Sequence, residues 1–412
     1  MARILSTSLV NVLATASGVT DPEALEARLP QLFQGVESLS QLFTRDRQDL
    51  RTSYLDQDQL RASYLAYYLP VNLAKVQALL EEMPLPEAAG QGSGGRFRVL
   101  DLGGGIGTTA LAVLDWLNST EALRDVKGEV VTVERSAPAL DLCERLWHAY
   151  KAVEPKLGLR LVPVKGDMGK WSAGRVPAGV AEGTYDLIVL GNVVNELFPD
   201  ARNPITRRVQ LLRDLLGLLH PQGTMMIVEP ALRDTSRHLL QLRDQLVVDG
   251  ACNVYSPCLH ERPCPALVKQ DDWCHEERPW EPPPVVAAID RRVGFIKDAL
   301  KFSYLLLRKD GQTVVPRSPD VYRVVSELRI MKGEKRAWLC NEGGRPEVGR
   351  QDRMKSVSNA PVDDWHRGAI VKIDQIVRKE RKGRESTVGR IPPSATAGTI
   401  QPVEIKGRRR PG

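Results

Sequence analysis

The sequence of 412 residues has few aromatic side chains, 5% of the total, and no apolar run as long as a membrane-spanning helix. Such a helix needs at least about 18 consecutive apolar residues, so we expect that the chain does not span a bilayer. Polar side chains interrupt the apolar stretch between residues 1 and 18, which predicts an amphipathic helix rather than a signal peptide. The contents of 42% hydrophobic and 26% charged residues are typical of a soluble globular protein with two or three domains.

The net positive charge of the chain is concentrated near its end, because elsewhere acidic and basic residues balance. Residues 378–412 hold ten Lys or Arg and three Glu, which gives this segment a formal charge of +7. The whole chain has a formal charge of +6, so the other residues sum to −1. A basic segment without apolar periodicity is expected to be disordered and suits a polyanion, although such a tail can also serve only solubility. The sequence therefore predicts a basic disordered tail over 377–412.

Three further regions differ in their periodicity. Residues 1–90 have apolar side chains at helical spacing, with a helix start at Asp21-Pro22 and a kink expected at Pro70. Residues 91–310 alternate apolar strands with helices, which indicates a doubly wound α/β fold with a parallel sheet. Residues 311–376 contain short strands and glycine-rich turns, which favour a small OB-like barrel. In the α/β region we expect strands over 98–102, 129–134, 159–165, 185–190, 224–229 and 302–307, and helices over 108–117, 137–149 and 207–219.

The cysteines are too clustered for a secreted disulfide scaffold. Four of the six fall within 23 residues, in a proline-rich insertion over 252–284 that lacks apolar periodicity. Clustered thiols in a chain without a convincing export signal indicate metal or redox ligands, because ligation can replace missing hydrophobic burial. The six are Cys143, Cys252, Cys258, Cys264, Cys274 and Cys340.

Spacing alone does not identify the metal. Zinc would accept any four of the thiolates and imidazoles, which include His260 and His275. An iron–sulfur cluster prefers four thiolates and often has a proline beside one of them, as in Cys264-Pro265. Both metals remain open at this point.

A glycine loop, Asp101-Leu102-Gly103-Gly104-Gly105-Ile106-Gly107, joins the first predicted strand of the α/β region to its first helix. Glycines let the backbone turn sharply and approach a ligand at a helix amino terminus, a device that also holds dinucleotides. Asp101 would repel a phosphate, but it could hold an ammonium group directly or through water. The loop therefore favours S-adenosylmethionine.

Polar residues end the next three strands in order. Glu134 is placed to accept hydrogen bonds from both ribose hydroxyls, Asp167 and Met168 stand where adenine would lie, and Asn192 faces the methyl group. Together with Asp101, Gly103, Gly105 and Gly107, this series resembles the motifs of class I, Rossmann-like, S-adenosylmethionine-dependent methyltransferases. No acceptor motif follows Asn192, so the sequence identifies no catalytic residue.

Several segments resemble one family, the methyltransferase-like proteins of the mitochondrial small ribosomal subunit and their bacterial relatives. The cysteine segments are the most specific of them. The matching segments are Tyr64 to Pro70, Leu100 to Gly107, Asn195-Glu196-Leu197, Pro257 to His260 with Cys264-Pro265, Asp272 to His275, and Lys301 to Leu305.

The resemblance implies a [4Fe-4S] cluster held by Cys258, Cys264, Cys274 and Cys340, and binding to small-subunit ribosomal RNA during subunit assembly. It also implies a chain that is monomeric off the ribosome, in the bacterial cytoplasm, which we prefer, or in the mitochondrial matrix. Methylating activity does not follow from it. Two alternatives stay open: an active RNA methyltransferase, and a methyltransferase of a small molecule or protein with a structural zinc.

Overall fold

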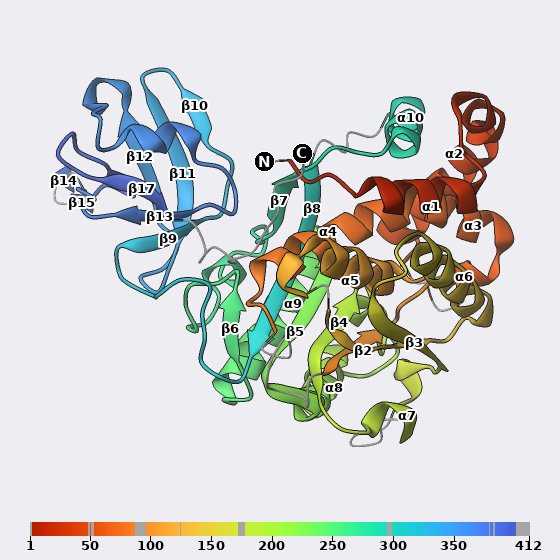
Figure 1. Ribbon diagram of the computed structural model, residues 1–412. Helices are drawn as coiled ribbons and strands as arrows, with labels where there is room; N and C mark the ends of the chain where they lie inside the picture. The colour runs from red at the N-terminus through yellow and green to blue at the C-terminus, as the bar shows by residue number, and fades with distance from the viewer. Residues whose placement is uncertain are drawn as a thin grey trace.

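The computed structural model describes residues 2–47, 50, 53–86, 96–123, 125–171, 178–294, 299–378, 380–381 and 384–400. The predicted glycine-rich linker at 87–95 and most of the basic end, 401–412, lie outside these ranges. Within the described residues, helices come first, a large α/β sheet follows, and a second sheet closes the chain (Figure 1).

The amino-terminal region is helical. Its elements are α1 (Thr7–Ser17), α2 (Pro22–Thr44), the 3-10 turn η2 (Tyr54–Asp56), α3 (Asp58–Ser63), the π-helical turn η3 (Tyr64–Tyr68) and α4 (Leu69–Glu82). As predicted, a helix begins at Pro22, because the Asp21 side chain accepts a hydrogen bond from the amide of Ala24 at 2.9 Å. Pro70 lies at the start of α4, directly after the π-helical turn η3, and the helix runs on through the predicted kink with this π turn before the proline.

The main sheet has the order β3-β2-β1-β4-β5-β8-β6, with β7 also paired to β8. Strands β1 to β5 are parallel, as predicted. Strand β8 runs antiparallel to β5, and β6 and β7 run antiparallel to β8, so the sheet is mixed. The strands are β1 (Arg96–Leu102), β2 (Lys127–Glu134), β3 (Gly158–Lys165), β4 (Tyr185–Gly191), β5 (Leu219–Pro230), β6 (Asn253–Ser256), β7 (Glu276–Pro279) and β8 (Ala299–Arg308).

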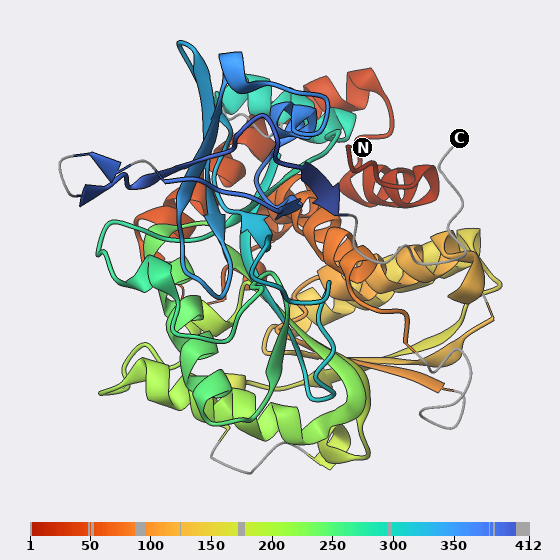
Figure 2. The same cartoon turned by 90° about the vertical axis from the view of Figure 1, so that its left-hand side faces the viewer.

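Helices cover both faces of this sheet. They are α5 (Thr108–Ser119), α6 (Ala137–Val153), the short α7 (Ala178–Ala181), α8 (Pro204–Leu218), α9 (Arg233–Val248) and α10 (Pro284–Val293), with 3-10 turns η5 (Glu121–Leu123), η6 (Met168–Lys170), η7 (Val194–Glu196) and η8 (Pro265–Leu267). Helices α9 and α10 were not predicted. Both views place α8 on the opposite side of the sheet from α1 and α2 (Figure 1 and Figure 2).

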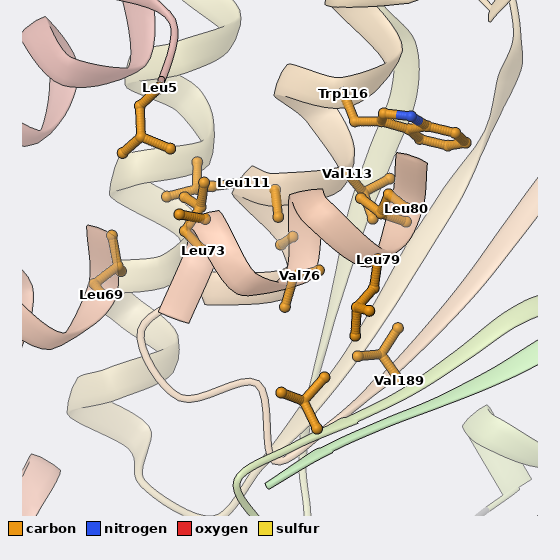
Figure 3. Packing of buried hydrophobic residues seen from close by; sticks show 14 of the residues in the cluster. Leu5, Leu69, Leu73, Val76, Leu79, Leu80, Leu111, Val113, Trp116 and Val189 are labelled. Atoms are coloured by element: carbon orange, nitrogen blue, oxygen red, sulfur yellow. The ribbon is translucent and has the colours of Figure 1, made fainter. Parts of the chain in front are cut away.

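Alternate side chains of the central strands enter two separate cores. Val99 of β1 packs into the core under α1, α4 and α5, while the next residue, Leu100, packs into the core under α8 and α9. Figure 3 shows the first core: α4 lies between α5 and the sheet, with Val76 and Leu79 pointing toward the strand that carries Val189. The amino-terminal helices are thus part of the α/β core.

Residue 3 is held at the far edge of this body. The amide of Arg3 donates to the carbonyl of Pro279 at 2.9 Å, and the amide of Glu281 donates to the carbonyl of Arg3 at 2.8 Å. The chain segment ahead of α1 is therefore bonded to residues almost 280 positions later.

The second sheet stands to one side of the main sheet, opposite α1 to α3 (Figure 1). Its order is β16-β12-β11-β9-β13-β17, with β10 paired to β11, around a core that contains Trp365 and Val371. Its strands are β9 (Val321–Val324), β10 (Arg329–Met331), β11 (Glu334–Cys340), β12 (Glu347–Gln351), β13 (Ile370–Ile373), β16 (Val388–Arg390) and β17 (Ala397–Ile400), with 3-10 turns η9 (Asp352–Met354) and η10 (Ala360–Asp364) and a separate pair of β14 (Glu380–Arg381) and β15 (Arg384–Glu385).

Two sequence-based boundaries differ from the structure. The tail predicted to be disordered from residue 377 contains β16 and β17, and β17 completes the second sheet by pairing with β13. The cysteine-rich insertion is bounded by β6 and β7, which are strands of the main sheet. Both differences have the same cause: these strands have only two to four residues, too few to show an apolar period.

Candidate functional site

A cavity of about 730 Å³ opens at the carboxyl ends of the parallel strands. Ligands of doubly wound sheets bind at this edge, where the strand order reverses between β1 and β4. Most of the sequence-predicted cofactor residues line the cavity, namely Gly103, Gly105, Glu134, Asp167, Met168 and Asn192. The structure therefore brings together residues that are up to 89 positions apart.

The glycine loop forms one wall of the cavity, and the packing below it excludes a side chain. A Cβ atom at Gly104 would lie 2.0 Å from Oγ1 of Thr132 and 2.5 Å from Oδ2 of Asp101. Gly107, which begins α5 at φ 99°, lies over Cys143 instead of lining the cavity. The loop thus presents its backbone to the cavity.

Asp101 lies beneath the loop and not in the cavity wall. It is 1% exposed, and its Oδ2 accepts a hydrogen bond from Oγ1 of Thr132 at 3.0 Å. Burial raises the pKa of Asp101 to about 7, although hydrogen bonds from Thr109 and Thr132 act in the opposite direction. A direct contact between Asp101 and a cofactor ammonium group stays a prediction.

Replacing Gly104 by alanine is expected to destabilise the fold by about 1–3 kcal/mol, because the new methyl group overpacks against Thr132 and Asp101. Denaturant unfolding measures this change. Gly217→Ala is the matched control: a Cβ there meets nothing within 4 Å inside α8, so stability should stay level or rise by up to about 1 kcal/mol. Equal effects of the two substitutions would contradict the packing described for the loop.

Glu134 ends β2 and binds the loop to the following helix. Its carboxylate accepts hydrogen bonds from the amides of Gly105 at 3.1 Å, Arg135 at 2.8 Å and Ser136 at 2.9 Å. A carboxylate has about four acceptor positions, so one remains for a ligand hydroxyl group. Because Glu134 also lines the cavity, it could accept from one ribose hydroxyl while it orders the loop.

The β3 end supplies the opposite wall of the cavity. Asp167 caps the turn η6 by accepting from the amide of Gly169 at 2.9 Å, and its other oxygen lies 3.6 Å from Nζ of Lys170. Met168 is buried and presents an apolar surface of the kind that a planar base requires.

The amino-terminal helices cover the cavity, which the sequence analysis did not foresee. Tyr54, Leu55 and Tyr64 line it from above, and Cδ1 of Leu55 lies 3.4 Å from the position of a Cβ on Gly105. The rings of Tyr54 and Tyr64 are 6.0 Å apart, and Tyr64 Oη accepts a hydrogen bond from Asn72. The only sequence signal was the tyrosine-rich segment that begins at Tyr64.

The turn η7 follows β4 and forms the floor of the cavity. Asn192 lies between β4 and this turn at φ 58°, an uncommon backbone conformation that is typical of functional sites when the residue is not glycine. Val193 lies against the glycine loop, with its Cγ2 atom 2.8 Å from the position of a Cβ on Gly103. The turn and the loop are therefore in direct contact.

Two buried residues clamp η7 from outside the turn. Glu229, at the end of β5, accepts from the amide of Asn195 at 3.2 Å and from its side-chain amide. Arg208 of α8 donates to the carbonyls of Asn195 and Leu197, at 2.9 and 3.0 Å. Burial raises the pKa of Glu229 to about 7, and hydrogen bonds from Asn195 oppose this shift.

A second, smaller cavity of about 50 Å³ lies between the two sheets and is lined by Cys258, Cys264, Cys274 and Cys340. Three of these cysteines come from the segment between β6 and β7, and Cys340 comes from the end of β11. The structure thus brings the four predicted ligands to one place, as the sequence analysis required. The other cysteines, Cys143 and Cys252, lie in the hydrophobic cores.

Charged residues of α9 organise the cysteine-bearing segment. Arg237 donates to the carbonyls of Lys269 and Asp272, both at 2.6 Å. The fully buried Arg243 pairs with Asp244 at 2.5 Å, and the other oxygen of Asp244 accepts from the amide of Cys264 at 2.8 Å. The segment is therefore fixed by the protein itself.

The thiols are buried together, and the guanidinium groups of Arg243 and Arg345 lie near them. Burial, opposed by Arg345 and reinforced by Cys258, raises the pKa of Cys274 to about 11. Nε2 of His260 lies 3.5 Å from Sγ of Cys340. Among the described residues, no three histidine, cysteine or acidic side chains form a group that could hold a metal ion. The metal therefore stays a prediction.

A network of buried charges joins the sheets beside this cavity. Arg323 of β9 donates to Glu276 of β7 at 2.6 Å and to Tyr304 of β8 at 2.9 Å. Glu82, at the end of α4, accepts from Tyr304 at 2.6 Å and from Arg278 at 2.5 Å. The network connects the amino-terminal helices, the main sheet and the second sheet.

Known proteins give one family match. Residues 59–352 match the profile of the family described as Mitochondrial small ribosomal subunit Rsm22, which covers more than half of the chain. No curated protein matches the chain in sequence. Within the part of the chain that the structure describes, no helix is long and apolar enough to cross a membrane.

Several solved structures match parts of the chain. An O-methyltransferase family protein from Burkholderia thailandensis is 14% identical, over 69% of this chain and 73% of that one, with a TM-score of 0.34. An arsenic(III) S-adenosylmethionine methyltransferase from Chlamydomonas reinhardtii is 16% identical, over 66% of this chain and 85% of that one, with a TM-score of 0.30.

A TehB-like S-adenosylmethionine-dependent methyltransferase from Corynebacterium glutamicum is 19% identical over 39% of this chain, with a TM-score of 0.23. The match spans 62% of that protein, less than two thirds of its length. The strand order and the glycine loop at the edge of β1 give this chain the Rossmann-like fold of S-adenosylmethionine-dependent methyltransferases.

Proposed function

Because this chain belongs to the Rsm22 family, we propose that it is a methyltransferase-like factor that binds S-adenosylmethionine and acts on the small ribosomal subunit. The observation that carries this proposal is the family match over 59–352, a range that includes most of the residues that line the two cavities. The family name also supports a mitochondrial location, and it gives no support to the cytoplasmic location that the sequence analysis preferred.

The larger cavity would hold S-adenosylmethionine. The backbone of Gly103 and Gly105 would face the methionine part, Glu134 the ribose, and Asp167 with Met168 the adenine, while Asn192 would stand at the methyl group. Two observations support this arrangement: the loop has no room for a side chain at Gly104, and one acceptor position of Glu134 is free.

The smaller cavity would hold a [4Fe-4S] cluster on Cys258, Cys264, Cys274 and Cys340. Such a cluster binds one thiolate at each of its four irons, so its ligands stand further apart than those around a single ion. This agrees with four cysteines around a cavity of about 50 Å³, whereas one water needs only about 10–15 Å³.

The experiment that tests this proposal is anaerobic purification followed by metal and sulfide analysis and by sedimentation with small ribosomal subunits. We expect about four iron and four sulfide per chain, and binding to the subunit that S-adenosylmethionine strengthens. Zinc without sulfide would contradict the cluster. Failure to sediment with subunits would contradict the ribosomal role.

The second sheet, as an OB-like domain, would contact ribosomal RNA. The basic end of the chain would contact it as well. Removing residues 401–412 eliminates Lys406 and Arg408 to Arg410. The affinity falls with salt, and each phosphate contact makes the plot of log K against log salt steeper by about 0.7–0.9. We therefore expect the plot of the truncated chain to be less steep by about 2–3. The cut must follow Ile400, because an earlier one removes β17.

The control for this truncation keeps the length and removes the charge, by replacing the same four residues with glutamine. Both variants should show the same reduced slope in sedimentation at increasing salt. A slope that matches the full chain in both would show that these residues do not reach phosphates.

A further inference from the structure

The clamped turn η7 presents one side chain to the larger cavity that needs a separate explanation. None of the predicted contacts with S-adenosylmethionine involves this side chain. Glu196 ends the turn and lines the cavity between Asn195 and Leu197, the two residues that Arg208 holds by their carbonyls. Glu229 fixes Asn195 from the other side. Glu196 is thus held in place by its neighbours, as a group that acts on a reacting atom must be.

The carboxylate of Glu196 is enclosed but lacks a partner. Among the described residues, no hydrogen bond or ion pair of its side chain is found, whereas Glu134 accepts from three amides and Asp167 from one. Glu196 is half-buried and lines the cavity, so its carboxylate is open to a ligand or to a reacting atom.

The charges that face Glu196 come from several elements. Glu229 and Glu134 stand on the ends of β5 and β2, Arg47 and Arg135 approach from the side of α2 and β2, and Tyr54 and Tyr64 lie above. Burial and Glu229 raise the pKa of Glu196 to about 8, and the two arginines oppose this shift. Burial also raises the pKa values of both tyrosines, so neither phenol competes as a base.

The remaining wall suits a planar base on a charged chain. Tyr54 and Tyr64 offer aromatic faces, and Phe198 lines the entrance with the guanidinium of Arg207 4.9 Å from its ring centre. Arg47, Arg135 and Arg207 all line the cavity. Aromatic faces stack on bases, and arginines bind the phosphates beside a base that has left its helix.

We propose that Glu196 is the proton acceptor for methyl transfer to a ring or exocyclic nitrogen of an RNA base that enters this cavity, an inference that rests on the proposed binding of S-adenosylmethionine. The acceptor nitrogen forms a bond to the methyl carbon, and the bond between that carbon and the sulfonium sulfur breaks. The sulfur keeps the electron pair as S-adenosylhomocysteine leaves, and the proton of the nitrogen passes to Glu196.

The first test needs no turnover. S-adenosylmethionine carries a positive sulfur and S-adenosylhomocysteine a neutral one, so ionised Glu196 favours only the former. Calorimetry between about pH 6.5 and 9 should show that the ratio of the two dissociation constants shifts about tenfold in favour of S-adenosylmethionine. Such a shift corresponds to a pKa of Glu196 that differs by about one unit between the two complexes. Glu196→Gln should show a constant ratio, and the exposed control Glu121→Gln should match the wild type.

The second test is methyl incorporation into RNA of immature small subunits from labelled S-adenosylmethionine. Glu196→Gln should lower the rate by about 10²–10⁴-fold, with affinity for S-adenosylmethionine changed less than about tenfold. The wild-type rate should rise with pH until Glu196 is ionised.

The outcomes separate the two proposals. Binding of S-adenosylmethionine with a pH-independent ratio and without incorporation overturns the role of Glu196 and leaves the proposed function standing. Incorporation that Glu196→Gln does not slow also overturns it. Absence of S-adenosylmethionine binding in the wild type overturns both.

Discussion

Replacing Cys340 by serine is expected to remove most of the iron and sulfide from the anaerobically purified protein, with a loss of the cluster absorption. Cys340 is the only one of the four cysteines around the smaller cavity that the second sheet supplies, from the end of β11. Serine is a poor ligand for iron–sulfur clusters, and three thiolates leave one iron open to solvent and oxygen. Iron and sulfide per chain are the quantities to measure.

The matched control for this experiment is Cys252→Ser. Cys252 is 8% exposed and precedes β6, but it packs in the core under α8 and α9 and does not line the cavity. The variant should keep its iron and lose only a little stability. Full iron content in Cys340→Ser would instead indicate another ligand, and His260, 3.5 Å away, is the first residue to test.

The second large effect is expected at Arg323, whose side chain is buried between the two sheets. Replacement by methionine keeps the volume but leaves Arg278, at 3.3 Å, as the one ion-pair partner of Glu276 among the described residues, beside a hydrogen bond from the amide of Glu277 at 3.0 Å. Breaking a buried ion pair from one side costs about 3–5 kcal/mol, because the remaining charge stays desolvated. Denaturant unfolding should show this loss. The exposed Arg353→Met, whose side chain contacts only Gln351, should change stability by less than about 0.5 kcal/mol.

The pH dependence of stability provides a check on the same network. Arg278 and Arg323 overcome the effect of burial and lower the pKa of Glu82 from its usual 4.5 to about 2, and they lower the pKa of Glu276 as well. A depressed pKa contributes stability above pH 4.5, and that contribution is lost as the pH falls from 4.5 to 2. Arg323→Met should show a smaller loss across this window than the wild type. An identical acid profile would mean that the pairing does not stabilise the fold.

The parallel part of the fold was predictable because its strands are buried on both faces. Four apolar residues in a row, as from Leu187 to Leu190 in β4, give a signal that needs no knowledge of the partner strand. By contrast, α9 was missed because charges interrupt its apolar face, and those charges, Arg237, Arg243 and Asp244, serve the cysteine-bearing segment. A side chain whose partner lies far away in sequence gives no local pattern.

The candidate cofactor site was predictable for a related reason. Gly105, Glu134 and Asp167 follow successive strands, and parallel strands bring their carboxyl ends to one edge. The roof formed by Tyr54 and Tyr64 depends on how η2 and η3 pack on the sheet, which no period reveals. Likewise, the clamp on Glu196 from Glu229 and Arg208 exists only after β5 and α8 are in place.

The pairing of Arg3 with Pro279 and Glu281 has a consequence for synthesis of the chain. Helices α1 to α4 leave the ribosome early, but the strands that bury them emerge only over the stretch from β1 to β8, and the residues that bond Arg3 lie more than 270 positions after it. Until then their apolar faces are exposed to solvent, a state that favours aggregation and chaperone binding. A nascent chain arrested before residue 279 should therefore be far more sensitive to protease in its first hundred residues than the released protein.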